Sequence, residues 1–359
     1  MHVTRTWLKD FRSHVEAEVE WAPGVNVVTG DNGLGKTNLV EAVVLLSRLE
    51  SFRGAPTEAM IRIGADAAVV RGEVVREGRE HLIEMELPRQ GRTRVLVDRQ
   101  RVQRRSDVAR TLVTSVFSPD DLELIKSGPS ARRGFLDEVL VTRSARHEQG
   151  RMELDRVIRQ RNALLKGVRG NLDDAAALTL DVWDQRLADL GERWAAARDR
   201  LVDALSDDVN RAYEEVSQQA GAVRLEVVHG WSGSLGDALV ASRTDDVRRG
   251  VTLVGPHRDD LAVTLNDMPA RTHASQGEQR CLALALKVAA HRYLAEDLGV
   301  VPVLVLDDVF SELDPRRSAA LTAALPDGQV IVTSAVGVPE GASAERVIRV
   351  TADGLEVVL

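Results

Sequence analysis

The stretch "GDNGLGKTN", residues 30–38, constrains the fold of this chain more than any other. It fits the pattern G-x-x-x-x-G-K-[ST], and it stands between the β-rich run "GVNVVTG" and "TNLVEAVVLLSRL", whose apolar spacing predicts a helix. Backbone N–H groups of such a loop, with the helix N-terminus, form a cradle for phosphate. A chance glycine-rich turn is the alternative, and the flanking strand and helix argue against it. The candidate nucleotide-binding residues are Gly30, Asp31, Asn32, Gly33, Leu34, Gly35, Lys36 and Thr37.

Lysine is rare in this chain, which makes Lys36 informative. Lys and Arg total 47, yet lysine occurs at only five positions. A compact ammonium suits a narrow phosphate cradle better than a planar guanidinium. We therefore expect Lys36 to contact the β- and γ-phosphates of a nucleotide and Thr37 to give its hydroxyl to Mg²⁺.

Two carboxylates follow a second apolar run near the C-terminus. "VPVLVLDD" has the continuous hydrophobicity of a strand buried in a parallel sheet. At its end, Asp307 is the expected Mg²⁺ ligand. Asp308 is the expected acceptor of a proton from attacking water. The competing interpretation is that the two carboxylates cap a following helix.

A third motif, "ASQGEQRCLALALK", places Ser275, Gln276 and Gly277 directly before or at the start of an apolar helix. Such a helix start predicts a second phosphate site. Since one ATP needs a single cradle, the second site suggests that each subunit of an isologous dimer caps the nucleotide of the other. Ser275 as an ordinary N-cap is the alternative.

The chain divides into regions of different character. Residues 1–120 and 221–359 alternate short strands and helices, including an antiparallel meander from "AAVVRGEVVREG" to "TRVLVDRQRV". Residues 121–220 are strongly charged and predict two long helices joined by a turn at "RGNLDD". The predicted fold is an α/β P-loop NTPase head, discontinuous in sequence, with a helical arm inserted in it.

Composition limits the remaining possibilities. The net charge of −8 does not by itself indicate nucleic-acid binding, so binding to DNA would need a local basic patch. Cys281 is the only cysteine, which excludes a disulfide within the chain and a cysteine metal cluster. The start lacks the apolar core of a signal peptide and no apolar run reaches membrane-spanning length, so we expect a cytoplasmic protein. The candidate DNA contacts lie where the arm begins and could instead be solvated helix faces paired with Glu138 and Glu148: Lys126, Arg132, Arg133, Arg143 and Arg146.

The chain resembles the ABC-type ATPase heads of the SMC superfamily, and most closely its RecF family. The resemblance rests on the order and the residues of four stretches: "GDNGLGKTNLVEAV", "RGVTLVGPHRDDL", "SQGEQRCLALALK" and "LVLDDVFSELD". The resemblance implies that residues 30–37 are Walker A and that Asp307 and Asp308 are Walker B. It further implies a signature motif at Ser275–Gln279 and a D-loop at Ser311–Asp314. Arg12 matches an arginine that lies near the nucleotide in such heads, or it is a surface arginine.

The chain also departs from the ABC pattern. Three glutamines, Gln90, Gln100 and Gln103, are equal candidates for the glutamine loop. No histidine follows "QVIVTSA", where transporters place a switch histidine, so Thr333 or Ser334 is expected there. The stretch "GPHRDD" has no chemical explanation from the sequence, and we expect His257 to be structural.

By this resemblance the protein is expected to be a weak, DNA-stimulated ATPase that uses ATP and Mg²⁺. It would form a homodimer around ATP, bind double-stranded and gapped DNA, and assist recombinase loading with RecR and RecO near the nucleoid. The alternatives are an ABC transporter ATPase subunit and an SMC-like tether, for which the arm is too short.

Overall fold

The computed structural model describes residues 1–168, 170, 172–324, 327–335, 337–339 and 341–359. The chain forms two compact units. The first contains Met1–Asp121, Ala212–Ala220 and Leu284–Leu359, and the second contains Leu122–Arg211 and Gly221–Ala283. Two helices, α7 (Asp174–Ser217) and α10 (Gln276–Leu298), supply residues to both units.

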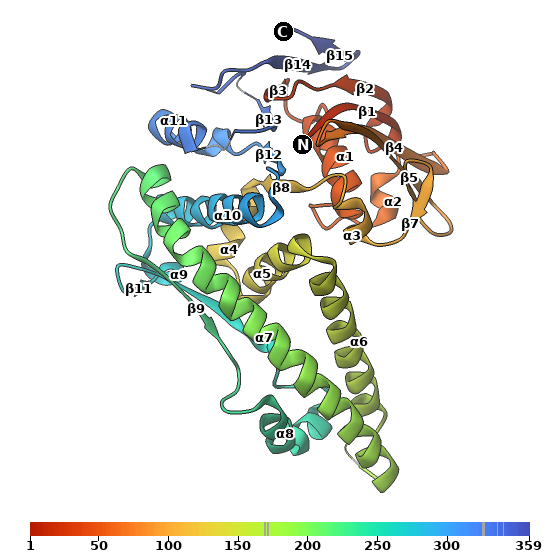
Figure 1. Cartoon of the computed structure of the whole chain (residues 1–359), viewed down its shortest axis with the longest axis vertical. Coiled ribbons are helices and arrows are strands. Elements are labelled where there is room, and N and C mark those ends of the chain that lie inside the picture. The colour runs from red at the N-terminus through yellow and green to blue at the C-terminus, as the bar shows by residue number, and fades with distance from the viewer. Residues whose placement is uncertain (169, 171, 325–326, 336, 340) are drawn as a thin grey trace. The chain divides into compact units, whose positions relative to one another are not determined.

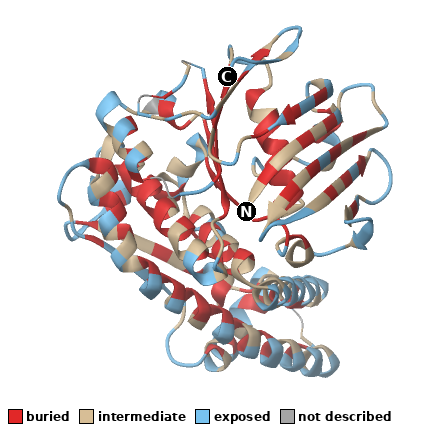
Figure 2. Cartoon of the chain, turned by 45° about the horizontal axis from the view of Figure 1, so that its top comes forward, coloured by how far each residue is buried: buried red, intermediate tan, exposed pale blue. Residues whose placement is uncertain are grey.

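In the first unit, one sheet is antiparallel and six-stranded, in the order β2-β1-β4-β5-β6-β7. Buried and exposed residues alternate along β4 and β5, as expected where one face of a sheet is covered and the other meets solvent (Figure 2). The predicted meander is therefore confirmed. Its strands are β1 (His2–Phe11), β2 (His14–Glu20), β4 (Ala67–Arg76), β5 (Arg79–Pro88), β6 (Arg94–Val97) and β7 (Gln100–Val102).

A second sheet has the order β15-β14-β3-β13-β12-β8, and its five strands from β14 to β8 run parallel. All five residues of β12 are buried, which confirms the predicted strand before the carboxylate pair. The strands are β3 (Val25–Thr29), β8 (Thr114–Phe117), β12 (Val303–Asp307), β13 (Val330–Ser334), β14 (Arg346–Thr351) and β15 (Gly354–Val357).

Helix α1 (Lys36–Arg48) is the core element that joins these two sheets (Figure 1). Its apolar residues from Leu39 to Leu46 are fully buried in one cluster with Leu8 and Ile83 of the antiparallel sheet and Val305 of the parallel sheet. The strand, loop and helix predicted around residue 30 are thus confirmed, and the start of α1 faces the carboxyl ends of the parallel strands. Smaller helices of this unit are α2 (Thr57–Met60), α3 (Arg105–Val108) and α11 (Pro315–Ala324), with a 3-10 turn η3 (Phe310–Glu312).

The second unit is mainly helical. The charged segment after residue 128 forms two helices, because Ser144 is extended and caps the second one by accepting a bond from the His147 N–H. Of the predicted "RGNLDD" turn, residues 169 and 171 lie outside the described residues. The helices are α4 (Glu123–Lys126), α5 (Pro129–Arg143), α6 (Ala145–Gly167), α8 (Leu235–Arg249) and α9 (Ala270–His273); the 3-10 turns are η1 (Pro119–Leu122), which begins in the first unit, and η2 (Pro256–Arg258).

The division into units differs from the expected arm of residues 121–220. The three-stranded sheet β11-β10-β9 and helix α8 group with the arm helices rather than with the first unit. The reason is visible in the contacts, since Arg132 on α5 binds the carboxylate of Asp260 at the start of β10. These strands are β9 (Val223–Val228), β10 (Asp260–Leu265) and β11 (Met268–Pro269).

Candidate functional site

The loop from Gly30 to Gly35 requires glycine at two points. Gly30 has φ +136°, and a Cβ there would lie 2.4 Å from the carbonyl oxygen of Val350. Gly35 has φ +102°, and a Cβ there would lie 2.7 Å from Ser13 Oγ. Both conformations are strained for L side chains, so the motif's glycines are needed to close the loop onto the helix start.

Lys36 lies folded into this loop. Its ammonium donates to the carbonyl oxygens of Gly30 (2.8 Å) and Asp31 (2.9 Å), and its side chain is almost fully buried. Among the residues that the structure describes, none forms an ion pair with it. The N-cap Gly35 also provides no side-chain acceptor to the first turn of α1. A buried cation without a counter-charge, beside an uncapped helix start, fits an anion such as phosphate.

The carboxyl ends of β12 and β13 bring three oxygen groups together beside the loop. Asp307 and Thr333 are register partners on these strands. Asp307 Oδ1 accepts bonds from Thr37 Oγ1 (2.9 Å) and Thr333 Oγ1 (2.8 Å). Residues separated by 270 positions therefore form one cluster, as the sequence predicted for Thr37 and Asp307.

This cluster fits Mg²⁺, which prefers oxygen ligands and keeps several positions for water and phosphate. Within the described residues, no group of three or more His, Cys, Asp or Glu side chains could hold a metal, so the protein alone would supply few ligands. Burial raises the pKa of Asp307, while the hydrogen bonds from Thr333 and Thr37 hold it down and the neighbouring Asp308 raises it further. A bound cation would offset the cost of burying the Asp307 carboxylate, because it stabilises the ionised form.

Asp308 has a constrained backbone and an unused carboxylate oxygen. Its φ is +52°, and its N–H donates to Thr333 Oγ1 at 2.9 Å. Its Oδ1 atom is buried and has no hydrogen-bond partner among the described residues. The helix-cap alternative is not observed, because the N-cap of η3 is Val309 and no side chain caps it. An orphaned buried carboxylate oxygen beside the cluster is available to hold water.

Thr333 is one of the two residues considered for the switch position. Its hydroxyl donates to the Asp307 carboxylate and accepts from the Asp308 N–H. Thr333 thus lies near the end of β13, in the place considered for a switch residue, where it contacts the Asp307 carboxylate and the Asp308 backbone.

Ser275 forms a capping box at the start of α10. The Ser275 N–H donates to Glu278 Oε2 at 2.7 Å, and Ser275 Oγ accepts from the Glu278 N–H at 3.3 Å. The N-cap geometry is therefore observed, with Gln276 and Gly277 in the first turn. The hydroxyl proton of Ser275 is not consumed by this bond, because the oxygen acts as acceptor.

Arg12 is committed to helix α1 rather than exposed as a surface arginine. Its side chain is 15% exposed and binds the fully buried Glu41 through Nε (2.8 Å) and Nη2 (2.6 Å). Nη1 donates to the carbonyl of Ala59. Ser51 Oγ donates to the same Glu41 carboxylate. The arginine locks the tip of the β1–β2 hairpin onto the helix that begins at Lys36.

The same hairpin tip supplies two residues that sequence reasoning missed. Ser13 Oγ accepts from Asn38 Nδ2 (2.9 Å), and His14 Nε2 lies 3.3 Å from the carbonyl oxygen of Gly35. Burial lowers the pKa of His14, and the contact with Gly35 opposes this effect. No local pattern identifies these residues, because their role depends on how the antiparallel sheet packs on α1.

The three glutamine-loop candidates lie in the antiparallel sheet and its connections. Gln90 and Gln103 are in exposed connections, and Gln100 begins β7 in the antiparallel sheet. After β8, the 3-10 turn η1 carries Asp121, whose carboxylate binds Lys287 Nζ at 3.0 Å. This pair was also not predicted from the sequence.

"GPHRDD", residues 255–260, now has a physical explanation within the second unit. Asp259, 1% exposed, receives Arg198 Nη1 at 3.2 Å, and Asp260 receives Arg132 Nε at 2.7 Å. Burial raises the pKa of Asp259, and the charge of Arg198 opposes this effect. The two aspartates therefore attach the strand β10 to helices α7 and α5.

His257 is structural, as expected. Its Nε2 lies 3.1 Å from the carbonyl oxygen of Thr252, to which Arg258 Nη2 also donates. Burial lowers the pKa of His257 to about 4, against the opposing effect of the Thr252 contact. The imidazole is therefore neutral at pH 7.

Of the expected DNA contacts at the start of the arm, Arg132 is contradicted by its burial, and the others stay predictions. Arg132 is buried against Asp260, and Arg133 donates to the carbonyl oxygen of Asp259 at 2.7 Å. Arg143 also has an interaction partner, and Arg146 is exposed. The alternative interpretation, a solvated side chain paired with a glutamate, does not hold for Arg132 or Arg133 either. Their partners are aspartates about 130 positions away, which the sequence alone did not reveal.

The whole chain can now be compared with known proteins. The family model of the RecF/RecN/SMC N-terminal domain matches residues 2–355, so the protein belongs to this family of ABC-type ATPase heads. This membership does not support the transporter alternative. No helix among the described residues has the length and apolar character needed to span a bilayer.

Within the family, the chain is similar to RecF. It is 42% identical to the DNA replication and repair protein RecF of Beutenbergia cavernae, covering 95% of this chain and 96% of that protein. It is likewise 42% identical to RecF of Streptomyces avermitilis, covering 94% of each. A solved structure of the recombination mediator protein RecF with ATP in the RecFOR pathway aligns with TM-score 0.89 at 27% identity, covering 100% of this chain and 98% of that chain. The Smc head domain of Pyrococcus furiosus shares the fold alone, with TM-score 0.59 and 16% identity over 99% and 96% of the two chains.

Proposed function

We propose that this protein is an ATP-dependent DNA-binding clamp of recombinational repair with a weak ATPase activity. The observation that carries the proposal is the cluster of Thr37, Asp307 and Thr333 beside the unpaired ammonium of Lys36. The family and its RecF members, one of them solved with ATP, support the same conclusion.

Residues 30–37 would bind the phosphates of ATP. Lys36 would exchange its bonds to the Gly30 and Asp31 carbonyls for phosphate oxygens, which supply the counter-charge it lacks. Thr37 and Asp307 would hold Mg²⁺, which when bound neutralises phosphate charge. Arg12, on the hairpin tip beside the P-loop, stays a predicted neighbour of the nucleotide.

Asp308 is the proposed general base. Its unpartnered Oδ1 would accept a proton from the water that attacks the terminal phosphate, while the Thr333 hydroxyl keeps its backbone in place. The D-loop, Ser311–Asp314, starts immediately after it, and Ser311 Oγ donates to the Asp308 carbonyl oxygen at 2.9 Å. Movement of that loop would therefore reach Asp308 directly.

Ser275, with Gln276 and Gly277, would complete the site in trans. Its hydroxyl proton and the uncommitted N–H groups at the start of α10 would contact the terminal phosphate bound by a second subunit. Two ATP molecules would then hold an isologous dimer, and hydrolysis would open it.

The dimer would bind double-stranded DNA and gapped DNA in the nucleoid of the cytoplasm and assist recombinase loading. RecO and RecR are the proposed protein partners, because the similar solved RecF structure is described as part of the RecFOR pathway. DNA binding would stimulate hydrolysis by stabilising the closed dimer.

Titration with a fluorescent ATP analogue and with labelled duplex DNA tests the proposal. The native chain should bind the analogue with Mg²⁺, and duplex affinity should increase when ATP is present. Lys36→Met should lose nucleotide binding while its melting temperature is retained. Duplex binding that is indifferent to ATP would contradict the clamp.

A further inference from the structure

The connection from β5 to α3 is the most basic segment of the first unit. Residues 89–105 contain seven arginines and a single acidic residue, Asp98, in a chain whose net charge is −8. The segment includes β6, β7 and their turns. The segment is therefore strongly positive although the protein as a whole is negative.

Five of these arginines are exposed and unneutralised: Arg92, Arg94, Arg99, Arg101 and Arg104. None of the five forms an ion pair with any part of the chain that the structure describes. The nearby carboxylates are used otherwise, since Asp98 binds His81 at 2.8 Å and Glu84 binds Arg71 at 3.1 Å. Glu86 stands opposite Arg94 in the strand register without an ion pair. We call these five side chains the hairpin arginines.

Several arginines elsewhere in the chain are paired with carboxylates. Arg12, Arg132, Arg161 and Arg198 are each bound to buried or half-buried carboxylates. Even on the solvent face of the same sheet, Arg5 binds Glu20 at 2.8 Å. Exposed arginines without an ion pair also occur elsewhere among the described residues, for example Arg146 and Arg156, so what distinguishes the hairpin arginines is that five of them lie within residues 89–105 beside a single acidic residue.

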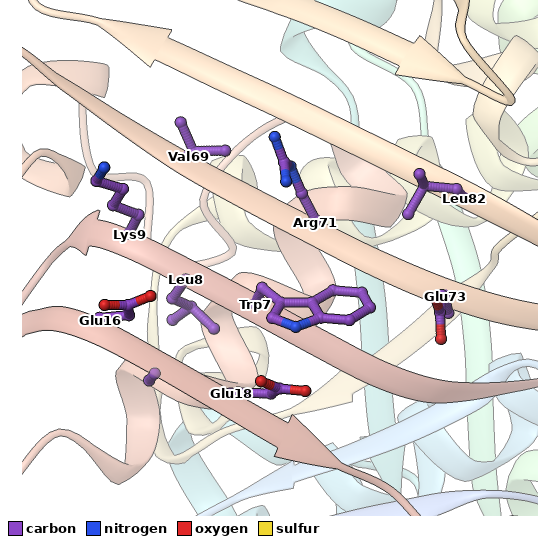
Figure 3. Close-up of a pocket in the computed structure, with 10 residues that line it drawn as sticks. Trp7, Leu8, Lys9, Glu16, Glu18, Val69, Arg71, Glu73 and Leu82 are labelled. Atoms are coloured by element: carbon purple, nitrogen blue, oxygen red, sulfur yellow. The ribbon is translucent and has the colours of Figure 1, made fainter.

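A hollow of about 680 Å³ on the β1–β4 part of this face gives a useful contrast (Figure 3). Around Trp7 it combines Lys9 and Arg71 with Glu16, Glu18 and Glu73. Its charges are mixed, so it offers no strong attraction to a polyanion. The hairpin arginines lie at the β6–β7 end of the sheet.

We propose that the hairpin arginines bind the phosphate backbone of duplex DNA, an inference that rests on the proposed function and places its DNA contact on the first unit. Arg94 and Arg101 lie on the same face, because Arg101 pairs with Leu96, two residues beyond Arg94. Such diagonal neighbours are about 7–8 Å apart, so two guanidinium groups can engage successive phosphates. Arg92, Arg99 and Arg104 flank them in the turns and after β7.

The composition of the segment favours duplex over single-stranded DNA. Residues 89–110 contain no Phe, Trp or Tyr, whereas single-strand binders stack bases on aromatic side chains. Contacts from arginine to phosphate position a duplex without reading its sequence. The hairpin should therefore bind duplexes of unrelated sequence with similar affinity.

The experiment compares two matched double variants by titrating labelled duplex DNA at 50 to 200 mM salt with ATP present. Arg94→Gln/Arg101→Gln removes two unpaired charges, and Arg5→Gln/Arg71→Gln removes two paired charges from the same sheet. The first should flatten the slope of log affinity against log salt by about 1.8, because each phosphate contact contributes about 0.9. Arg5→Gln/Arg71→Gln should leave the salt slope unchanged. Arg94→Lys/Arg101→Lys, which keeps both charges, should retain most of the native slope.

Nucleotide titration and thermal melting of each variant verify that the ATP site and fold are intact. Equal slopes for both glutamine variants, with tight binding by the native chain, would overturn the assignment of the hairpin and leave the clamp standing. Failure of the native chain to bind duplex DNA at any salt concentration would instead overturn the proposed function.

Discussion

The hydroxyl of Thr333 should stabilise the first unit because two buried groups depend on it. It donates to Asp307 Oδ1 at 2.8 Å and accepts from the Asp308 N–H at 2.9 Å, and the residue is 1% exposed. Thr333→Val keeps the side-chain shape and removes both bonds. A buried polar group left without its partner costs about 1–3 kcal/mol. Since the two bonds share one hydroxyl, we expect a combined loss of about 3 kcal/mol.

Thr333→Ser is the matched control, because it keeps the hydroxyl and loses one methyl group, worth about 1 kcal/mol. A loss of 1 kcal/mol lowers the melting temperature of a unit of this size by about 2–4 °C. Calorimetry should therefore show a decrease of about 6–12 °C for Thr333→Val and about 2–4 °C for Thr333→Ser. Equal melting temperatures for the two variants would refute the role assigned to the hydroxyl.

Three further outcomes are expected. Asp308→Asn should bind ATP and Mg²⁺ normally but hydrolyse ATP on the order of 10²–10⁴-fold more slowly in a steady-state phosphate-release assay, and normal turnover would place the base elsewhere. Arg161→Leu should destabilise the second unit by about 3–5 kcal/mol in urea unfolding, because it leaves the buried carboxylate of Asp246 without its ion-pair partner and removes one of the two arginines that bind Asp184; an unchanged midpoint would contradict this. His257 and His291, whose pKa values burial lowers to about 4, stay neutral in the fold but take up protons near pH 6.5 when unfolded, so stability is lost as pH falls. Each histidine should lower the free energy of unfolding by about 2 kcal/mol between pH 7.5 and 5.0. His257→Gln should therefore make the free energy of unfolding depend less on pH.

Much of the nucleotide site could be predicted from the sequence, because its residues occupy local patterns. The glycines and Lys36 stand between a strand and a helix, and Asp307 ends an apolar strand. Parallel strands carry their carboxyl ends to one edge of a sheet, so Thr37 and Asp307 meet despite 270 intervening residues.

Other features depend on tertiary contacts that no local pattern records. Ser13 and His14 reach the P-loop because their hairpin packs on α1. Arg132 is a candidate DNA contact by its charge, yet Asp260 neutralises it from a strand far along the chain. The same contacts explain why residues 221–283 group with the arm helices, contrary to the expected boundary.

The most direct test of the central claim uses two defective subunits together. Ser275→Arg should bind ATP, since its own P-loop is intact, but should neither dimerise nor hydrolyse ATP. Lys36→Met should fail to bind ATP. In a mixed dimer, one composite site carries both lesions and the other carries neither, so one complete site forms. The account predicts that ATPase activity returns when the two inactive variants are mixed, with a mixed dimer detected by sedimentation. If Ser275→Arg alone dimerises and hydrolyses ATP like the native chain, Ser275 only caps its helix and the shared site is wrong.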